Sequence, residues 1–194
     1  MRKTLFIADC HFCHENVIRF DNRPYSSVEE MNYCLIDNWN KAVDQKDTVY
    51  ILGDFIWKTS KNWLDIIGYL KGKKVLIRGN HDPRVMPDEI NKHFVEITDY
   101  KEIVENGQRI IMSHYPIPFY KGDYKENVWM FYGHVHRTRE YEYLKQIRNE
   151  IKKLKEYDGK PIGNFVNVGC MMPWMNYTPR TFEEIINEEC KYIM

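Results

Sequence analysis

Short apolar segments alternate with segments of helical periodicity through the first 80 residues, and this alternation restricts the possible folds more than any other feature. Strand-like apolar runs are predicted at Lys3–Asp9, Thr48–Leu52 and Lys74–Ile77. A helix is predicted at Ser26–Val43, where two serines each precede a glutamate by three positions as in a capping box, and another at Trp63–Leu70. A β-α-β-α order of this kind predicts strands buried between covering helices.

The second half of the chain follows a different pattern. Residues Tyr100–Glu105 and Arg109–Ser113 alternate in polarity on either side of Asn106-Gly107, which is a strong hairpin signal. Strands are also predicted at 128–132 and 165–168, a last helix at 181–190, and a charged helix at 139–157 whose apolar residues recur at helical spacing: Tyr143, Ile147, Ile151 and Leu154. We therefore expect antiparallel elements to dominate this half, and the chain to form two sheets covered by helices.

The length of 194 residues, with 43% hydrophobic residues, predicts one globular domain over residues 1–194. The 28 basic residues match the 28 acidic ones, whereas a protein that holds nucleic acid by non-specific phosphate contacts normally carries a basic surplus. The apolar run Leu5–Ala8 is far shorter than an export signal or a membrane span, so we expect a cytoplasmic protein with no membrane partner. In that compartment the five cysteines are expected to stay reduced.

Five small polar clusters each follow one of the strand-like runs. They hold five of the seven histidines and read Asp9-x-His11, Gly53-Asp54, Gly79-Asn80-His81-Asp82, Ser113-His114 and Gly133-His134-x-His136. Because strand ends in α/β folds are where loops converge, we expect these side chains to meet at one site. The glycines within the clusters permit tight turns and a close approach of the backbone.

The residue types in these clusters are typical of a metal centre. Imidazole and carboxylate ligands suit Mn, Fe, Zn, Ni or Co and require no cysteine. With one shared carboxylate, the candidates divide into two sets of four, drawn from Asp9, His11, Asp54, Asn80, His114, His134 and His136. Two metal ions about 3.5–4 Å apart can hold both the attacking and the leaving oxygen of an in-line phosphoryl displacement.

The complete ordered set of clusters resembles the calcineurin-like metallophosphoesterase superfamily. The surrounding sequence is similar to a small bacterial or phage-type subgroup, through the words His11-Phe12-Cys13-His14-Glu15-Asn16, Asn22-Arg23-Pro24-Tyr25, His114-Tyr115-Pro116-Ile117 and Asn167-Val168-Gly169. The resemblance implies a four-layer α/β/β/α sandwich of two mixed sheets. It covers residues 140–160 least well, so the helix at 139–157 could be a lid, an oligomer contact or a covering helix. The oligomeric state is not predicted.

The resemblance also implies a role for each cluster. One metal would be held by Asp9, His11, Asp54 and His136, and the other by Asp54, Asn80, His114 and His134, with Asp54 bridging the two. A hydroxide held between the two divalent ions would attack a phosphomonoester or phosphodiester in line. His81 would sit near the leaving oxygen as a general acid or stabilise charge there, and Asp82 would orient His81.

Two residues beside these clusters are candidates for substrate contact. His14 follows the first cluster and could point at the substrate, and Arg23 could grip a phosphate oxygen with two hydrogen bonds. The alternative is a surface histidine and a turn before Pro24. His93 lies in no cluster and is expected to be structural or solvated, and the apolar run 171–177 is expected to be core rather than a substrate wall.

Other functions compete with a metal-dependent phosphoesterase. The segment Cys10-His11-Phe12-Cys13-His14 matches a haem-attachment pattern, but that reading requires export and leaves the other clusters unexplained. A non-catalytic binding or scaffold protein on the same fold is a second alternative. Within the enzyme class, a nuclease acting on short nucleic acid is a third, with nucleic acid as substrate only.

Overall fold

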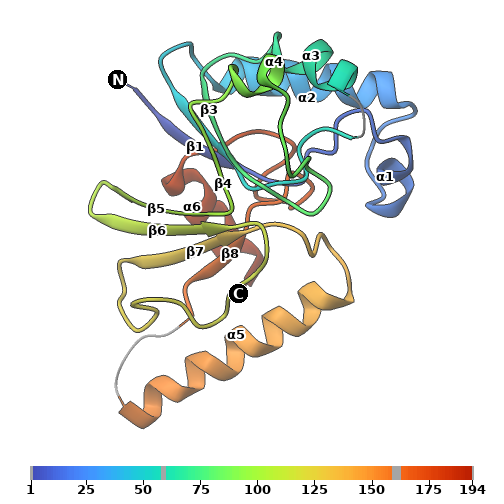
Figure 1. Cartoon of the computed structure of the whole chain (residues 1–194). Helices are drawn as coiled ribbons and strands as arrows, with labels where there is room; N and C mark the ends of the chain where they lie inside the picture. The colour runs from blue at the N-terminus through green and yellow to red at the C-terminus, as the bar shows by residue number, and fades with distance from the viewer. Residues whose placement is uncertain (1, 58–59, 159–162, 194) are drawn as a thin grey trace.

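Two four-stranded sheets pack face to face between helices in the computed structural model of the chain (Figure 1). The structure describes residues 2–57, 60–158 and 163–193. The two sheets meet through apolar side chains, and the rings of Phe6 and Phe131 touch edge to face with centroids 5.0 Å apart. This architecture confirms the predicted four-layer α/β/β/α sandwich.

The first sheet is built as the β-α alternation predicts. Its strands β1 (Thr4–Ile7), β2 (Thr48–Ile51), β3 (Lys73–Ile77) and β4 (Glu96–Thr98) lie side by side in chain order and pair in parallel. Right-handed crossovers between strands in that order place the connecting helices on one face. These helices are α2 (Val28–Ala42), α3 (Ser60–Ile67) and α4 (Asp88–Asn91), seen together above the sheet in Figure 1. An antiparallel bridge joins Phe6 to Arg180 at the edge of the sheet.

The predicted capping box at the start of α2 is confirmed. The Ser27 hydroxyl accepts a hydrogen bond from the Glu30 N–H at 3.1 Å, and the Glu30 carboxylate accepts one from the Ser26 N–H at 2.7 Å. The first bond satisfies a backbone donor that the first turn of a helix leaves unpaired, and the second satisfies the N–H just before the N-cap. They fix the point at which the chain leaves the loop that carries Arg23 and begins to cover the sheet.

The second sheet has the order β5 (Tyr100–Glu105), β6 (Gln108–Ser113), β7 (Val128–Tyr132) and β8 (Phe165–Asn167). The β5–β6 hairpin turns at Asn106-Gly107 as predicted. The expectation that antiparallel pairs dominate this half is wrong, because β6–β7 and β7–β8 pair in parallel. Each of those pairs is joined by a long crossover, residues 114–127 and the segment that contains α5, rather than by a tight turn.

The charged segment 139–157 is a helix, α5 (Arg139–Asp158), which covers the outer face of the second sheet (Figure 1). Of its side chains up to residue 153, Leu144 and Ile151 are buried, and they pack in one cluster with residues of β7 and β8. Tyr143 and Ile147 are instead 57% and 38% exposed. The prediction from apolar spacing that these two residues lie on the buried face of the helix is therefore wrong. The side chain of Leu154 lies outside the described residues.

The last helix, α6 (Phe182–Ile193), lies beside the sheets and is tied to α5. The guanidinium of Arg148 donates to the buried Glu189 carboxylate at 2.5 and 3.3 Å. The apolar run that precedes α6 is core as expected, since Met172, Trp174 and Met175 are buried. In the part of the chain that the structure describes, no helix is long and apolar enough to cross a bilayer.

Three elements have no counterpart in the sequence analysis: α1 (Glu15–Phe20), α4 and β4. All three are short, at six, four and three residues, so they carry too little periodicity to be read from sequence. Helix α1 matters most for function, because it directly follows the first polar cluster and is followed by Asp21 and Arg23.

Candidate metal centre

The five polar clusters meet where the two sheets join. Asp9, Asp54 and Asn80 follow β1, β2 and β3, which are neighbours in the first sheet. His114 follows β6 directly, and the last cluster follows β7, the neighbour of β6 in the second sheet. Because neighbouring parallel strands end at the same edge, side chains far apart in sequence reach one site.

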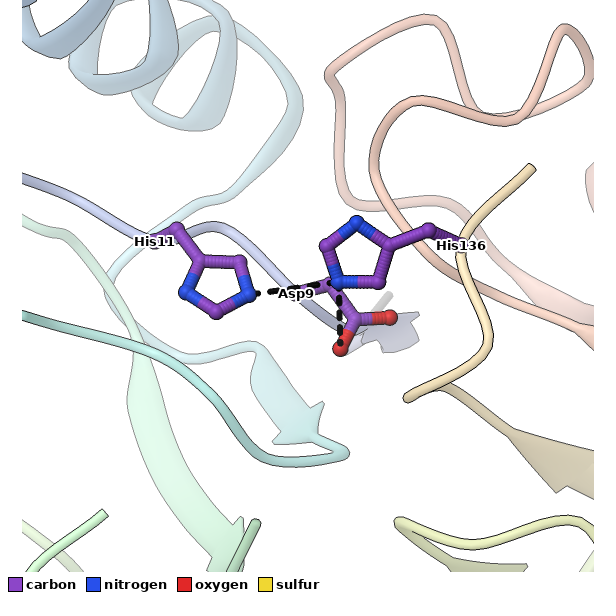
Figure 2. Close-up of side chains that lie close together, drawn as sticks. All are labelled: Asp9, His11 and His136. Carbon is purple, nitrogen blue, oxygen red and sulfur yellow. Dashed lines mark hydrogen bonds and ion pairs between the residues drawn. The ribbon is translucent and has the colours of Figure 1, made fainter. Parts of the chain in front are cut away.

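The first group of candidate ligands is Asp9, His11 and His136, whose ligand atoms all lie within 4.8 Å of one another. Figure 2 shows the two imidazole rings turned toward each other with the Asp9 carboxylate beside them. The Nε2 atoms of His11 and His136 are 3.3 Å apart, and His136 Nε2 lies 3.8 Å from Asp9 Oδ1. Asp9 and His11 come from the loop after β1, and His136 comes from the loop after β7.

The second group is Asp54, His114 and His134, within the same 4.8 Å limit. Asn80 adjoins this group, since its Oδ1 lies 3.0 Å from His114 Nε2. Both carboxylates of the centre are fixed by backbone donors. The Asp9 oxygens accept the His134 N–H at 3.1 and 3.0 Å, and Asp54 Oδ1 accepts the His81 N–H at 2.9 Å.

Asp54 lies between the two groups. Its Oδ2 is 3.6 Å from His11 Nε2 in the first group and 3.6 Å from His114 Nε2 in the second. Asp54 is only 3% exposed. Burial, together with the charge of Asp9, raises the pKa of the Asp54 carboxyl, although the charge of His114 opposes the shift. A carboxylate in this position can serve both groups at once.

The backbone at the centre is held in an unusual conformation. Asp9, His11, Asp54, His134 and His136 all have positive φ, between 46° and 70°. Residues other than glycine seldom adopt this left-handed region, and each such residue costs on the order of 1–3 kcal/mol. Five of the seven predicted ligands share this cost, which is typical of functional sites whose side chains must be aimed at a fixed point.

Two of the imidazole rings are oriented by bonds made on their far side. His114 Nδ1 donates to the carbonyl oxygen of Leu52 at 2.8 Å, and His136 Nδ1 donates to Asp21 Oδ1 at 2.6 Å. When such a ring is neutral, it presents the lone pair of its Nε2 to the centre. Nitrogen ligands of metal ions are commonly oriented in this way.

This donor set fits a metal ion. With the His114 proton on Nδ1, its Nε2 and the Asn80 Oδ1 are both acceptors, yet they lie 3.0 Å apart. His136 Nε2 faces His11 Nε2 at 3.3 Å. Burial lowers the pKa of His136, but its hydrogen bond to Asp21 and the charge of Asp9 outweigh burial and raise the pKa to about 9, so this position attracts a cation. Acceptors that converge without a proton between them repel, and a cation among them removes the repulsion. Imidazole with carboxylate suits divalent transition metals.

Asp21 is a site residue that the sequence analysis missed. It accepts the His136 hydrogen bond from 115 residues away along the chain, and its other oxygen accepts two hydrogen bonds from Arg23 at 3.0 and 2.8 Å. Burial alone raises the pKa of Asp21, but the His136 bond and the Arg23 charge outweigh it and lower the pKa. Its sequence signal is weak, because an aspartate before Asn22 reads as an ordinary turn residue.

Arg23 is placed differently from the predicted substrate contact. It is 4% exposed, and besides Asp21 it donates to the carbonyl oxygens of Cys10 and Asp9 at 2.8 and 2.9 Å. Its guanidinium is therefore committed to protein acceptors behind the first group of ligands. The structure corrects the prediction: Arg23 fixes the backbone of the Asp9 loop and the position of Asp21 rather than facing a phosphate.

Asp82 also differs from its predicted role. Its carboxylate is buried and accepts hydrogen bonds from the backbone N–H groups of Asp54, Phe55 and Gly79 at 2.9, 3.0 and 2.8 Å. It joins the loops after β2 and β3 and so sets where Asp54 and the neighbouring His81 lie. The prediction that Asp82 orients the His81 ring directly does not match these contacts.

His81 and His14 lie at the mouth of the centre. The side chain of His81 is 44% exposed, and its Nε2 lies 3.9 Å from Asp54 Oδ2. The ring of His14 stacks on Trp57 with centroids 3.9 Å apart and lies 5.5 Å from the ring of His11. Trp57 also touches the His81 ring edge to face at 4.8 Å. Both histidines stay candidates for contact with a substrate.

Comparison with known proteins agrees with this site. A family model described as calcineurin-like phosphoesterase matches residues 2–168. The chain belongs to this family. This calcineurin-like phosphoesterase is 38% identical over 155 residues to an uncharacterised protein of Methanocaldococcus jannaschii. The match covers 78% of this chain and 80% of the relative.

Two further comparisons place this calcineurin-like phosphoesterase among relatives of similar length. The gene 66 protein of Mycobacterium phage L5 is 28% identical over 166 residues, which covers 70% of this chain and 78% of the phage protein. A crystal structure of a protein of unknown function from Aquifex aeolicus superposes with a TM-score of 0.67 at 30% identity, covering 97% of this chain and all of that chain. The last match supports the fold over nearly its full length.

Proposed function

We propose that this chain is a phosphoric ester hydrolase with a dinuclear metal centre, which cleaves a phosphomonoester or phosphodiester. The observation that carries the proposal is the place of Asp54, whose Oδ2 lies 3.6 Å from a histidine nitrogen of each candidate group. A carboxylate shared in this way is what two adjacent metal ions require.

The two groups would hold divalent transition metals: Asp9, His11, Asp54 and His136 on one side, and Asp54, Asn80, His114 and His134 on the other. When bound, such a pair supplies Lewis acidity to the phosphoryl oxygens and a hydroxide nucleophile at neutral pH. The ligand types fit Mn, Fe, Ni, Zn and Co alike, and manganese is the first ion to test.

The remaining work falls to residues at the mouth of the centre. His81 is half exposed beside Asp54 and, in its protonated form, can give a proton to the leaving oxygen. Its backbone N–H is held by Asp54 and its loop by Asp82, so its position follows that of the bridging carboxylate. His14, stacked on Trp57, is held rigidly enough to contact the substrate on the side of the first group.

A metal-dependence assay tests the proposal. Metal-stripped protein is supplied with Mn²⁺ and offered p-nitrophenyl phosphate and bis(p-nitrophenyl) phosphate. We expect turnover of at least one ester, and a loss of at least about 100-fold in kcat in Asp54→Asn. Asp37→Asn is the matched control, because Asp37 lies on α2 and, among the residues that the structure describes, forms an ion pair with Lys41 alone. Full turnover in Asp54→Asn overturns the proposal.

The same assay addresses the alternatives. Two bound metal ions with no turnover of either ester, or of a short single-stranded oligonucleotide, would favour a binding or scaffold protein. Cleavage of the oligonucleotide together with the diester, and not of the monoester, would favour a nuclease. The proposed location is the cytoplasm, and a membrane has no part in the proposed reaction.

A further inference from the structure

A cavity of about 520 Å³ opens beside the second group of candidate ligands. It lies between the loop after β3 and the end of β6, and its wall includes Arg78, Asn80, Arg84, Asp99, Ser113 and Tyr115. Asn80 belongs both to this wall and to the metal centre, so the two are continuous. The volume falls within the range of about 300–1,000 Å³ that is usual for small-molecule sites.

The charges on this wall are unevenly matched. Arg78 donates to both oxygens of Asp99, at 2.8 and 2.9 Å. The charges of these two side chains therefore balance each other. Arg84 is exposed on the same wall, and among the residues described it makes no ion pair within 4.0 Å. The Asp82 carboxylate is buried, and its oxygens accept hydrogen bonds from backbone N–H groups. Asp99 also feels Arg84, because the hydrogen bond and charge of Arg78, followed by the charge of Arg84, lower the pKa of its carboxyl. Two guanidiniums thus share one exposed carboxylate, which leaves the exposed part of the wall with a surplus positive charge.

Tyr115 links the cavity to the metal centre. Its ring touches the ring of His134 with centroids 4.6 Å apart, and the residue is 49% exposed. A molecule whose phosphoryl group lies at the metal centre and whose remainder lies in this cavity would meet walls that carry this ring and Arg84, since both line the cavity. The cavity thus combines a metal-binding side, an aromatic ring and a cationic group.

We propose that this cavity binds a second anionic group of the substrate, a carboxylate or a phosphate, and that Arg84 recognises it. The inference rests on the proposed phosphoesterase function and narrows its substrate class to phosphate esters that carry an additional acid group. Guanidinium pairs with carboxylate and phosphate by two parallel hydrogen bonds, which gives direction as well as charge. Because Arg84 is exposed to solvent, its effect is moderate, about five- to tenfold in affinity.

Binding of phosphonates tests this inference without depending on turnover, because their carbon–phosphorus bond is not hydrolysed. Mn²⁺-loaded protein is titrated by calorimetry with phenylphosphonate, 4-phosphonobenzoate and 1,4-phenylenediphosphonate. The first has one anionic group, the second adds a carboxylate and the third adds a phosphonate. We expect at least one of the last two to bind about five- to tenfold more tightly than the first, and the stronger of them identifies the preferred acid group.

Arg84→Gln is compared with Arg139→Gln, a matched control at the exposed start of α5. The advantage of the second anionic group should fall to twofold or less in Arg84→Gln and persist in Arg139→Gln. Equal affinity of all three phosphonates for the wild type, an advantage that survives Arg84→Gln, or no binding of any phosphonate contradicts the inference. Turnover of simple esters with no such advantage would leave the proposed function standing and remove only this subsite.

Discussion

His136 donates a hydrogen bond from Nδ1 to Asp21 Oδ1 at 2.6 Å, across 115 residues of sequence. This contact directs His136 Nε2 toward Asp9 and His11, and the Arg23 guanidinium fixes Asp21 in turn. The positions of the first group of candidate ligands therefore depend on two residues outside that group. Their contribution can be separated from that of the ligands.

Replacement of Asp21 should weaken metal binding without removing a ligand. Loss of such a hydrogen-bond partner typically lowers metal affinity by about 10- to 100-fold, so Asp21→Asn should lower the affinity for one of the two Mn²⁺ ions by that factor. Calorimetric titration of metal-stripped protein measures it, with Asp37→Asn as the control on the surface of α2. Equal affinities in the two variants would show that Asp21 does not support the centre.

Arg23→Met should destabilise the fold rather than alter substrate affinity. It removes hydrogen bonds to two backbone carbonyls and leaves the buried Asp21 without its cationic partner, which typically costs about 3–5 kcal/mol. Urea unfolding measures the loss, and Arg19→Met is the control because Arg19 is exposed on α1. Normal stability with a raised KM would restore the substrate contact predicted from sequence.

Gly133→Ala should disturb Asp9. A Cβ atom at residue 133 would lie 2.6 Å from Asp9 Oδ2 and 2.7 Å from the Ala8 Cβ, closer than any real contact. The carboxylate would have to move, so we expect weaker metal binding and a loss of on the order of 1–3 kcal/mol in stability. Gly68→Ala is the control, since a Cβ there meets only Leu64 O at 3.6 Å. Unchanged metal affinity in Gly133→Ala would contradict this geometry.

Lys74 should give the stability of the protein a specific pH dependence. Burial lowers its pKa from 10.5 to about 8, and its ammonium donates to the carbonyl oxygens of Leu70 and Gly72. Between pH 8 and 10.5 the unfolded chain binds more protons at this residue, so its contribution to stability rises with pH in that window.

Lys74→Met should remove that rise, as measured by urea unfolding at several pH values, whereas Lys73→Met should keep it. Lys73 is the matched control because it is exposed on the same strand. Parallel pH profiles of the wild type and Lys74→Met would show that the buried ammonium does not set this dependence.

The strands and the ligands were predictable because both are local signals. An apolar run that ends in Asp9-x-His11 or in Gly133-His134-x-His136 is visible in a few residues, and all seven predicted ligands do meet at one centre. The hairpin at Asn106-Gly107 is equally local. The parallel pairing of β6 with β7 could not be predicted, because it depends on the path of a long crossover and no short sequence pattern encodes that path.

The roles of Arg23, Asp82 and Asp21 could not be predicted for a related reason. Each acts through backbone groups or side chains that only the folded chain brings near, such as the carbonyl of Asp9 for Arg23. The buried face of α5 was misjudged because Arg148, which pairs with Glu189, lies where an apolar residue would be expected. Polar residues with distant partners are the ones that sequence patterns place least well.

Anomalous diffraction from crystals of Mn²⁺-loaded protein tests the proposed bridge of Asp54 between two metal ions. We expect two anomalous peaks about 3.5–4 Å apart, one among Asp9, His11 and His136, the other among Asp54, His114 and His134, with Asp54 in contact with both. A single peak, or two peaks that Asp54 does not join, would contradict it.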